Sequence, residues 1–117
     1  MATFSKVLLS GSTNGKGVKV VATASAGTTI HTAVAGTSDL DEVCMWVVNS
    51  DTSDRKLTLQ YGGTTTVDND IEITIPAESG LVPVVPGLLL QNGLGIKAYG
   101  AAANVLVIYG YCNRITA

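Results

Sequence analysis

Few side chains in this chain could do chemistry, and none stands at the spacing of a known catalytic motif. His31 is the only histidine, and its surroundings, TTIHTAV, include no carboxylate. A lone histidine on a strand is more often structural than a general base, so we expect His31 to be structural. The members of a Ser-His-Asp triad converge in space, which leaves that alternative open. The chain has no G-x-S-x-G motif to support it, and we predict no enzyme activity.

The two thiols, Cys44 and Cys112, have no histidine or second cysteine at the spacing of a zinc site. Both lie in apolar runs, so we expect small buried hydrophobic residues, with a disulfide as the alternative. The segment GSTNGKG (residues 11–17) lacks the G-x-x-x-x-G-K-[ST] spacing of a phosphate-binding loop, and no helix pattern follows it. We interpret it as a glycine-rich turn.

Acidic residues gather in the segments 38–42, 49–54 and 67–70. These segments contain Asp39, Asp41, Asp51, Asp54, Asp68 and Asp70. Calcium takes oxygen ligands of this kind, but none of the segments has the twelve-residue EF-hand spacing. Asp and Asn more often stabilise turns by bonding to their own backbone. We therefore predict solvated turns and no metal or other cofactor, with calcium as the alternative.

Composition indicates one domain spanning residues 1–117 with little charge on its surface. Hydrophobic residues make up 46% of the chain and charged residues 14%, against roughly 25% charge in an average globular protein. The net charge of -2 and the scattered basic residues argue against nucleic acid as a partner. No segment approaches the ~20 apolar residues of a membrane span, so we expect no membrane partner.

The elements that must position these residues are strands. No window shows a helical apolar stripe, whereas β-branched residues and glycine recur throughout. Segments 55–61 and 71–75 alternate apolar and polar residues, which predicts one solvated face each. Segments 6–10 and 17–24 are predicted to pair across Asn14-Gly15, and Asn92-Gly93 predicts a second hairpin.

Two strands are apolar on both faces. Segment 42–48 has this pattern, and so does the C-terminal segment 104–115, NVLVIYGYCNRI. In the latter, Val107, Tyr109 and Tyr111 share one face, while the other face meets the core. The exposed face needs a cover, and we expect another subunit rather than a loop, since exposed apolar patches usually mark interaction sites.

The segment LVPVVPGLLLQNG (residues 81–93) is less regular. Its prolines belong on an edge or at a bend. Leu88, Leu89 and Leu90 cannot all face one interior because neighbouring residues alternate in a strand. We therefore add these three leucines to the predicted interface.

Eight or nine short strands predict an all-β fold, an antiparallel jelly-roll-like β-sandwich. The alternative is an up-and-down β-barrel, which would produce the same alternation of apolar and polar residues.

Three segments resemble small virion-associated proteins of tailed bacteriophages: GTTIHTAVAGTSDLDEV, NSDTSDRKLTLQYGG and IPAESGLVPVVPGLLLQNGLGIKAYGAAANVLVIYGYCNRI. The resemblance covers about residues 5 to 115 and carries no catalytic signature. It implies a capsid cement or decoration protein, often a jelly roll, that forms a homotrimer. Such a protein would bind the major capsid protein on the outside of the head, after assembly in the host cytoplasm. The alternatives are a tail, neck or fibre-associated virion module and a carbohydrate-binding module.

Overall fold

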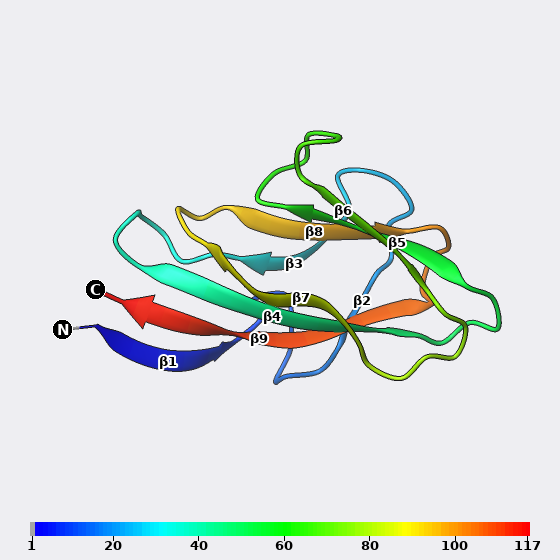
Figure 1. Ribbon diagram of the computed structural model, residues 1–117, viewed down its shortest axis with the longest axis horizontal. Coiled ribbons are helices and arrows are strands. Elements are labelled where there is room, and N and C mark those ends of the chain that lie inside the picture. The colour runs from blue at the N-terminus through cyan, green and yellow to red at the C-terminus, as the bar shows by residue number, and fades with distance from the viewer. Residues whose placement is uncertain (1) are drawn as a thin grey trace.

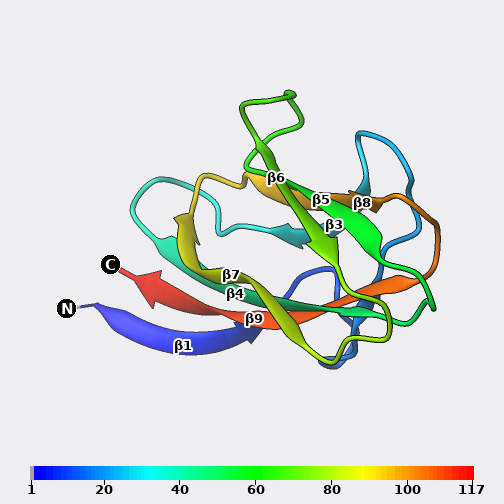
Figure 2. The same cartoon turned by 45° about the vertical axis from the view of Figure 1, so that its right-hand side comes forward.

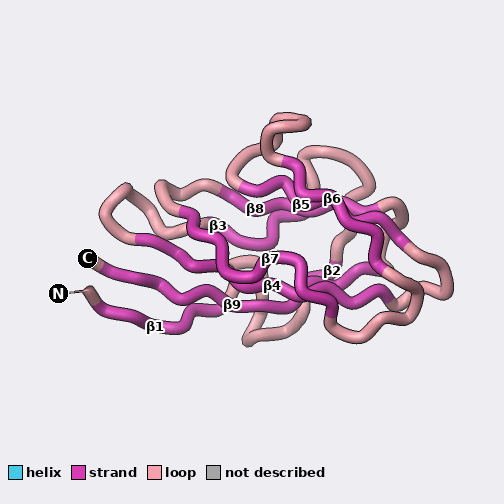
Figure 3. The backbone as a smooth tube through the Cα atoms, in the orientation of Figure 1, coloured by secondary structure: helices cyan, strands magenta, loops and turns pink. Residues whose placement is uncertain are grey.

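The computed structural model describes residues 2–117, which form nine strands in two antiparallel sheets and no helix (Figure 1). The strands are β1 (Thr3–Leu8), β2 (Val18–Lys19), β3 (Thr28–Thr32), β4 (Leu40–Asn49), β5 (Arg55–Tyr61), β6 (Asp70–Ile75), β7 (Val82–Leu90), β8 (Gly95–Gly100) and β9 (Leu106–Thr116). Figure 3 shows the strands in two layers that are joined by loops. Among the described residues, nothing forms a helix with the length and apolarity needed to cross a membrane.

The first sheet, sheet A, has the order β1-β9-β4-β7, and β2 also pairs with β9. The pairing of β4 with β9 runs without a shift from Leu40 opposite Ile115 to Asn49 opposite Leu106. Along its ten residues, β4 alternates strictly between half-buried and buried positions. The unbroken register keeps the alternation of the two strands in phase, so each strand contributes one row of side chains to each face, as predicted.

The second sheet, sheet B, has the order β3-β8-β5-β6. Leu57 and Leu59 point into the core as predicted. The opposite side of β5 was predicted to be solvated, and this is wrong for Thr58 and Gln60, which are buried. The loops before β3 and before β6 stand on this side of sheet B (Figure 2), and Ser25 in the first of them donates a hydrogen bond to Gln60 Oε1 over 3.1 Å.

The hydrophobic core fills the space between the two sheets. Its fully buried members include Ile30, Val43, Met45, Val47, Leu57, Leu59, Ile75, Ile96, Leu106 and Ile108. From β2 onward, the chain crosses between the sheets at every connection except the β5–β6 hairpin. This is the predicted jelly-roll-like sandwich, because the two sheets stay separate rather than closing into the alternative barrel.

Both predicted turns are present, but neither joins a hairpin. Asn14 and Gly15 have φ values of 55° and 87°, and Asn92 and Gly93 have 63° and 66°, as a type I′ turn requires. However, β1 and β2 pair with β9 rather than with each other, and β7 and β8 belong to different sheets. The turn residues reverse the chain locally, while the burial of each strand's apolar face selects its partner.

A close approach of β9 to β4 depends on Gly110. A Cβ at this position would overlap the carbonyl oxygen of Cys44 and lie 3.0 Å from Met45 Cα. We expect Gly110→Val to lower the free energy of unfolding by roughly 1–3 kcal/mol, the usual cost of overpacking, as measured by urea denaturation. Gly80→Ala is the control, since a Cβ there meets nothing within 4 Å. Equal losses in the two variants would contradict this assignment.

Candidate functional site

The fold brings three charged or titratable side chains from three strands into one buried cluster. Asp41 on β4 accepts hydrogen bonds from His31 on β3 and from Arg114 on β9. The distance from His31 Nε2 to Asp41 Oδ2 is 2.9 Å, and the guanidinium of Arg114 reaches both carboxylate oxygens over 2.8 and 3.0 Å. His31 and Asp41 have no exposed surface. The cluster therefore links the edge strand of sheet B to the two central strands of sheet A.

A β-bulge brings His31 into this cluster. Successive residues of a regular strand point to opposite faces, yet Ile30 and His31 are both fully buried. The pairing of β3 with β8 shifts register between Thr29 and His31, and a bulge of this kind re-aims a side chain. The strand is an edge strand of sheet B.

Both ring nitrogens of His31 are engaged. The backbone N–H of Ser10 donates to Nδ1 over 2.9 Å, so Nδ1 carries no proton and the proton of the neutral ring lies on Nε2. That proton is donated to Asp41, which also accepts the backbone N–H of Val34 over 3.1 Å. A buried ring without a free nitrogen lone pair cannot act as a general base, so the arrangement supports a structural role.

Cys112 lies beside the cluster, with its sulfur 3.7 Å from His31 Nε2. Among residues 2–117, His31, Asp41 and Cys112 are the one group of three whose possible ligand atoms all lie within 4.8 Å of one another. The chemistry does not suit a metal, because metal ligands must be deprotonated. Nε2 holds the proton, burial raises the pKa of Cys112 to about 11, and Arg114 already pairs with the carboxylate.

The carboxyl group of Asp41 stays ionised in the cluster. Burial by itself raises its pKa, but the hydrogen bonds from Arg114 and His31, the charge of Arg114 and the Val34 N–H outweigh this effect. Together they lower the pKa of Asp41 to about 2. The buried charge is thus neutralised by Arg114, and the buried side-chain nitrogen and oxygen atoms of the cluster all have partners.

The low pKa of Asp41 predicts acid sensitivity. Since the folded pKa lies below the unfolded value, the stabilisation is present above about pH 4 and is lost as the pH falls towards 2. The shift corresponds to about 2 kcal/mol. Between about pH 4 and pH 2, the free energy of unfolding of Asp41→Asn should therefore fall by about 2 kcal/mol less than that of the unsubstituted chain. Urea denaturation at several pH values measures this difference. Asp68→Asn, in an exposed loop, is the control, and an unchanged pH profile in Asp41→Asn would contradict the assignment.

The two cysteines lie on opposite faces of sheet A. Cys44 pairs with Tyr111, whereas Cys112 pairs with Val43, the neighbour of Cys44. Successive residues of a strand point to opposite faces, so the thiols cannot meet, and both cysteines are free. Cys112 is buried as predicted, while Cys44 is half-buried on the outside of the sheet.

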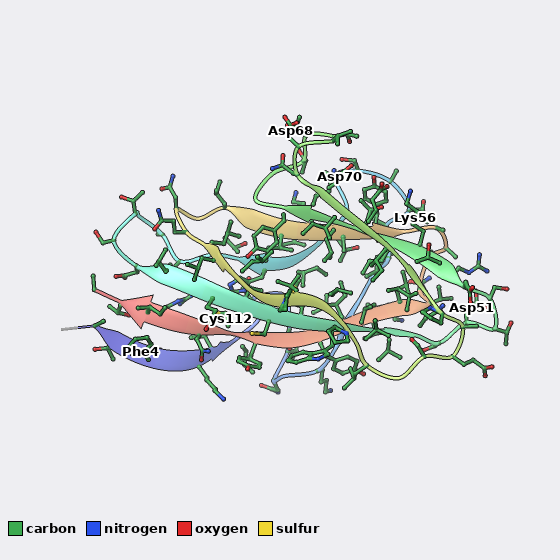
Figure 4. All side chains as sticks on the ribbon, in the orientation of Figure 1. Phe4, Asp51, Lys56, Asp68, Asp70 and Cys112 are labelled. Atoms are coloured by element: carbon green, nitrogen blue, oxygen red, sulfur yellow. The ribbon has the colours of Figure 1, made fainter. Side chains whose placement is uncertain are left out.

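The acidic loops do not converge (Figure 4). Asp51 lies at one end of the molecule, where it pairs with Arg55, and Asp68 lies at the tip of the loop above sheet B. Asp54 accepts the backbone N–H of Ala77 over 2.8 Å. The part of the chain that the structure describes has no other group of three such ligands besides the His31 cluster. Asp39, Asp51, Asp54 and Asp68 lie in turns and loops, as predicted. The prediction of a solvated turn is wrong for Asp41, which is fully buried on β4, and Asp70 is the first residue of β6.

Segment 11–17 is a turn, as predicted, and it lies against sheet A. The hydroxyl of Ser12 donates to the carbonyl oxygen of Lys16 over 2.7 Å. Gly17 packs so closely that a Cβ would overlap Val107 and lie 2.8 Å from the ring of Tyr109. The loop therefore covers part of the outside of β9.

A small pocket opens on the outside of sheet B. Its volume is about 170 Å³, and its lining includes Thr23, Thr58 and Tyr99. An ion pair of 2.7 Å between Lys56 and Glu72 borders it. Typical ligand pockets measure roughly 300–1,000 Å³. With this size and one aromatic ring, the pocket offers no stacking platform of several rings for a carbohydrate.

The outward side of sheet A, here called the outer face, is rich in apolar residues. The register and the burial alternation assign to it Phe4, Lys6, Leu8, Lys19, Leu40, Glu42, Cys44, Trp46, Val48, Pro83, Pro86, Leu89, Val107, Tyr109, Tyr111, Asn113 and Ile115. Phe4 is 69% exposed and projects from the edge strand β1 (Figure 4). Segment 11–17 covers the part of this face around Val107 and Tyr109, and much of the remainder is in contact with solvent.

Aromatic side chains form the centre of the outer face. The rings of Trp46 and Tyr111 stack with their centroids 6.1 Å apart. The ammonium of Lys6 lies 5.1 Å from the centroid of Tyr111. Tyr109 remains 40% exposed. Large side chains with a polar tip on a solvent-facing sheet are typical of protein interfaces.

The predicted interface residues are only partly brought together. Val107, Tyr109 and Tyr111 share the outer face, and Leu89 joins them, 54% exposed. Leu90 points inward and is 9% exposed, so it belongs to the core. Leu88 is 42% exposed but pairs with the inward-facing Val43.

Sequence reasoning missed Phe4, Leu8 and Trp46 as members of this face. The alternation of Phe4, Lys6 and Leu8 was the available signal, but the first strand was predicted to begin at residue 6 rather than at Thr3. No protein-family model, curated protein or solved structure matches the chain.

Proposed function

We propose that this chain is a structural virion protein of a tailed phage, a capsid cement or decoration protein. It binds the outside of the head through the major capsid protein and stabilises contacts between capsomers. The proposal extends the resemblance found in the sequence, and the outer face of sheet A is the observation that carries it.

The outer face supports this role because it is an apolar surface that the chain itself leaves uncovered. Phe4, Leu8, Leu89 and Tyr109 are each at least 40% exposed, and exposed apolar patches of this kind mark sites of association. The titratable groups that a catalytic site would use are instead held in the buried His31 cluster. Together, these features favour association over turnover.

The physics of a shell explains how such a protein would act. Packaged DNA pushes the shell outward, and a protein that bridges capsomers adds contact area that must be broken before the shell expands. The free energy of that contact opposes expansion. A net charge of -2 on 117 residues limits repulsion when many copies pack together.

Within this proposal, the chain is a homotrimer. The outer face, with Val107, Tyr109 and Tyr111, forms the contact between subunits. The segment around Leu88 and Leu89 lies at the β7 edge, where it contacts either the neighbouring subunit or the capsid.

The copy number in purified particles tests the proposed function. Quantitative mass spectrometry should give a ratio to the major capsid protein close to that of a shell component. A copy number that matches a single vertex or a tail would instead indicate a tail or neck module and would contradict the cement role. Absence from the particle would refute a virion role altogether.

Tyr109→Asp tests the subunit contact. A carboxylate in place of the Tyr109 ring, which is 40% exposed beside segment 11–17, would be buried within the subunit contact without a partner. We therefore expect the mass in light scattering to fall from three times the 12.0 kDa chain mass to one. Tyr99→Asp, on the outside of sheet B, is the matched control and should keep the trimer mass. An unchanged mass for Tyr109→Asp would count against this contact.

A further inference from the structure

The charged residues of the outer face are divided between its two sides. Lys6 on β1 and Glu42 on β4 both pair with Asn113 on β9, so the three residues form one row across the sheet. Neighbouring strands lie roughly 4.8 Å apart, which separates the two charged positions by about 10 Å. Lys19 on β2 is also on the β1 side of β9. One side of the face is therefore basic, and the other is acidic.

Each charged side also carries exposed apolar residues. Phe4 and Leu8 flank Lys6 along β1. Leu89 on β7 stands opposite Glu42, and Pro86 lies opposite the next outward position of β4, Cys44. Two unlike surfaces on one face, each apolar with a charge of opposite sign, are complementary to each other.

Stacking two copies flat against each other would be obstructed. Packed sheets lie about 10 Å apart, and segment 11–17 projects from the outer face, where Gly17 packs on Val107 and Tyr109. Figures 1 and 2 both show the loop before β2 below β9, on the side away from sheet B. A contact in which one side of the face meets the opposite side of the next copy avoids this loop.

We infer that a neighbouring copy of this chain binds the outer face head to tail, with Lys6 of one copy against Glu42 of the next. This inference rests on the proposed homotrimer and names its contact. Phe4 and Leu8 pack against the β4–β7 side of the neighbour, and the ion pair sets the register. A contact between unlike surfaces repeats from copy to copy, and in the proposed homotrimer it closes into a ring of three.

Charge reversal tests the contact directly in the full-length chain. Lys6→Glu and Glu42→Lys should each weaken self-association at least about tenfold, because each places like charges together. The double variant Lys6→Glu/Glu42→Lys should restore the trimer mass in light scattering. Lys97→Glu, which points outward from sheet B between the buried Ile96 and Ala98, should have no effect. Circular dichroism checks that every variant is folded.

Mixing the two single variants tests the ring. Wherever a Lys6→Glu subunit meets a Glu42→Lys subunit, positions 6 and 42 carry opposite charges. An even ring or a two-fold dimer can alternate the two variants, and its assembly would therefore be restored completely. A three-membered ring always keeps at least one contact between like variants, and the 1:1 mixture should therefore assemble less completely than the double variant.

Three results would overturn the inference. The first is that both single variants are folded and keep the trimer mass. The second is that the double variant is folded but does not regain the trimer mass. The third is that the mixture of single variants associates completely, as dimers. These masses are measured on the isolated protein, whereas the copy number is measured on particles. The inference and the proposed function can therefore fail separately.

Discussion

The pairing of β4 with β9 is the constraint on which the rest of the structure depends. Ten consecutive residue pairs, from Leu40 with Ile115 to Asn49 with Leu106, place alternate side chains on the two faces of sheet A. The inner row, with Val43, Met45 and Ile108, is covered by sheet B. The outer row is also largely apolar, and no second sheet covers it. One ladder thus produces both the core and the surface that we propose for association.

The sequence was sufficient to predict those parts of the fold that depend on alternation alone. The two apolar faces of segments 42–48 and 104–115 were readable because the side-chain period of a strand is two residues. Strand partners were not readable. Asn14-Gly15 and Asn92-Gly93 form the expected turns, yet partner choice depends on long-range burial, which a local turn signal does not contain.

The buried cluster lay beyond sequence reasoning for two physical reasons. Asp41 is 10 residues from His31 and 73 residues from Arg114. The pairing of β4 with β9 within sheet A unites Asp41 with Arg114, and the packing of sheet B on sheet A adds His31. The bulge before His31 also breaks the alternation of a regular strand, so the sequence pattern could not place His31 in the core. The cluster joins the sheets through ionised and hydrogen-bonded groups whose buried side-chain atoms all have partners, which gives His31 a structural role.

The central claim is that the outer face of sheet A is covered in the assembled particle. Hydroxyl-radical footprinting read by mass spectrometry tests it most directly, by comparing the particle-bound protein with the monomeric chain. We expect Trp46, Tyr109 and Tyr111 to be protected in the particle, while Tyr99 on sheet B serves as the reference ring. Equal labelling of the three outer-face rings in both states would contradict the account.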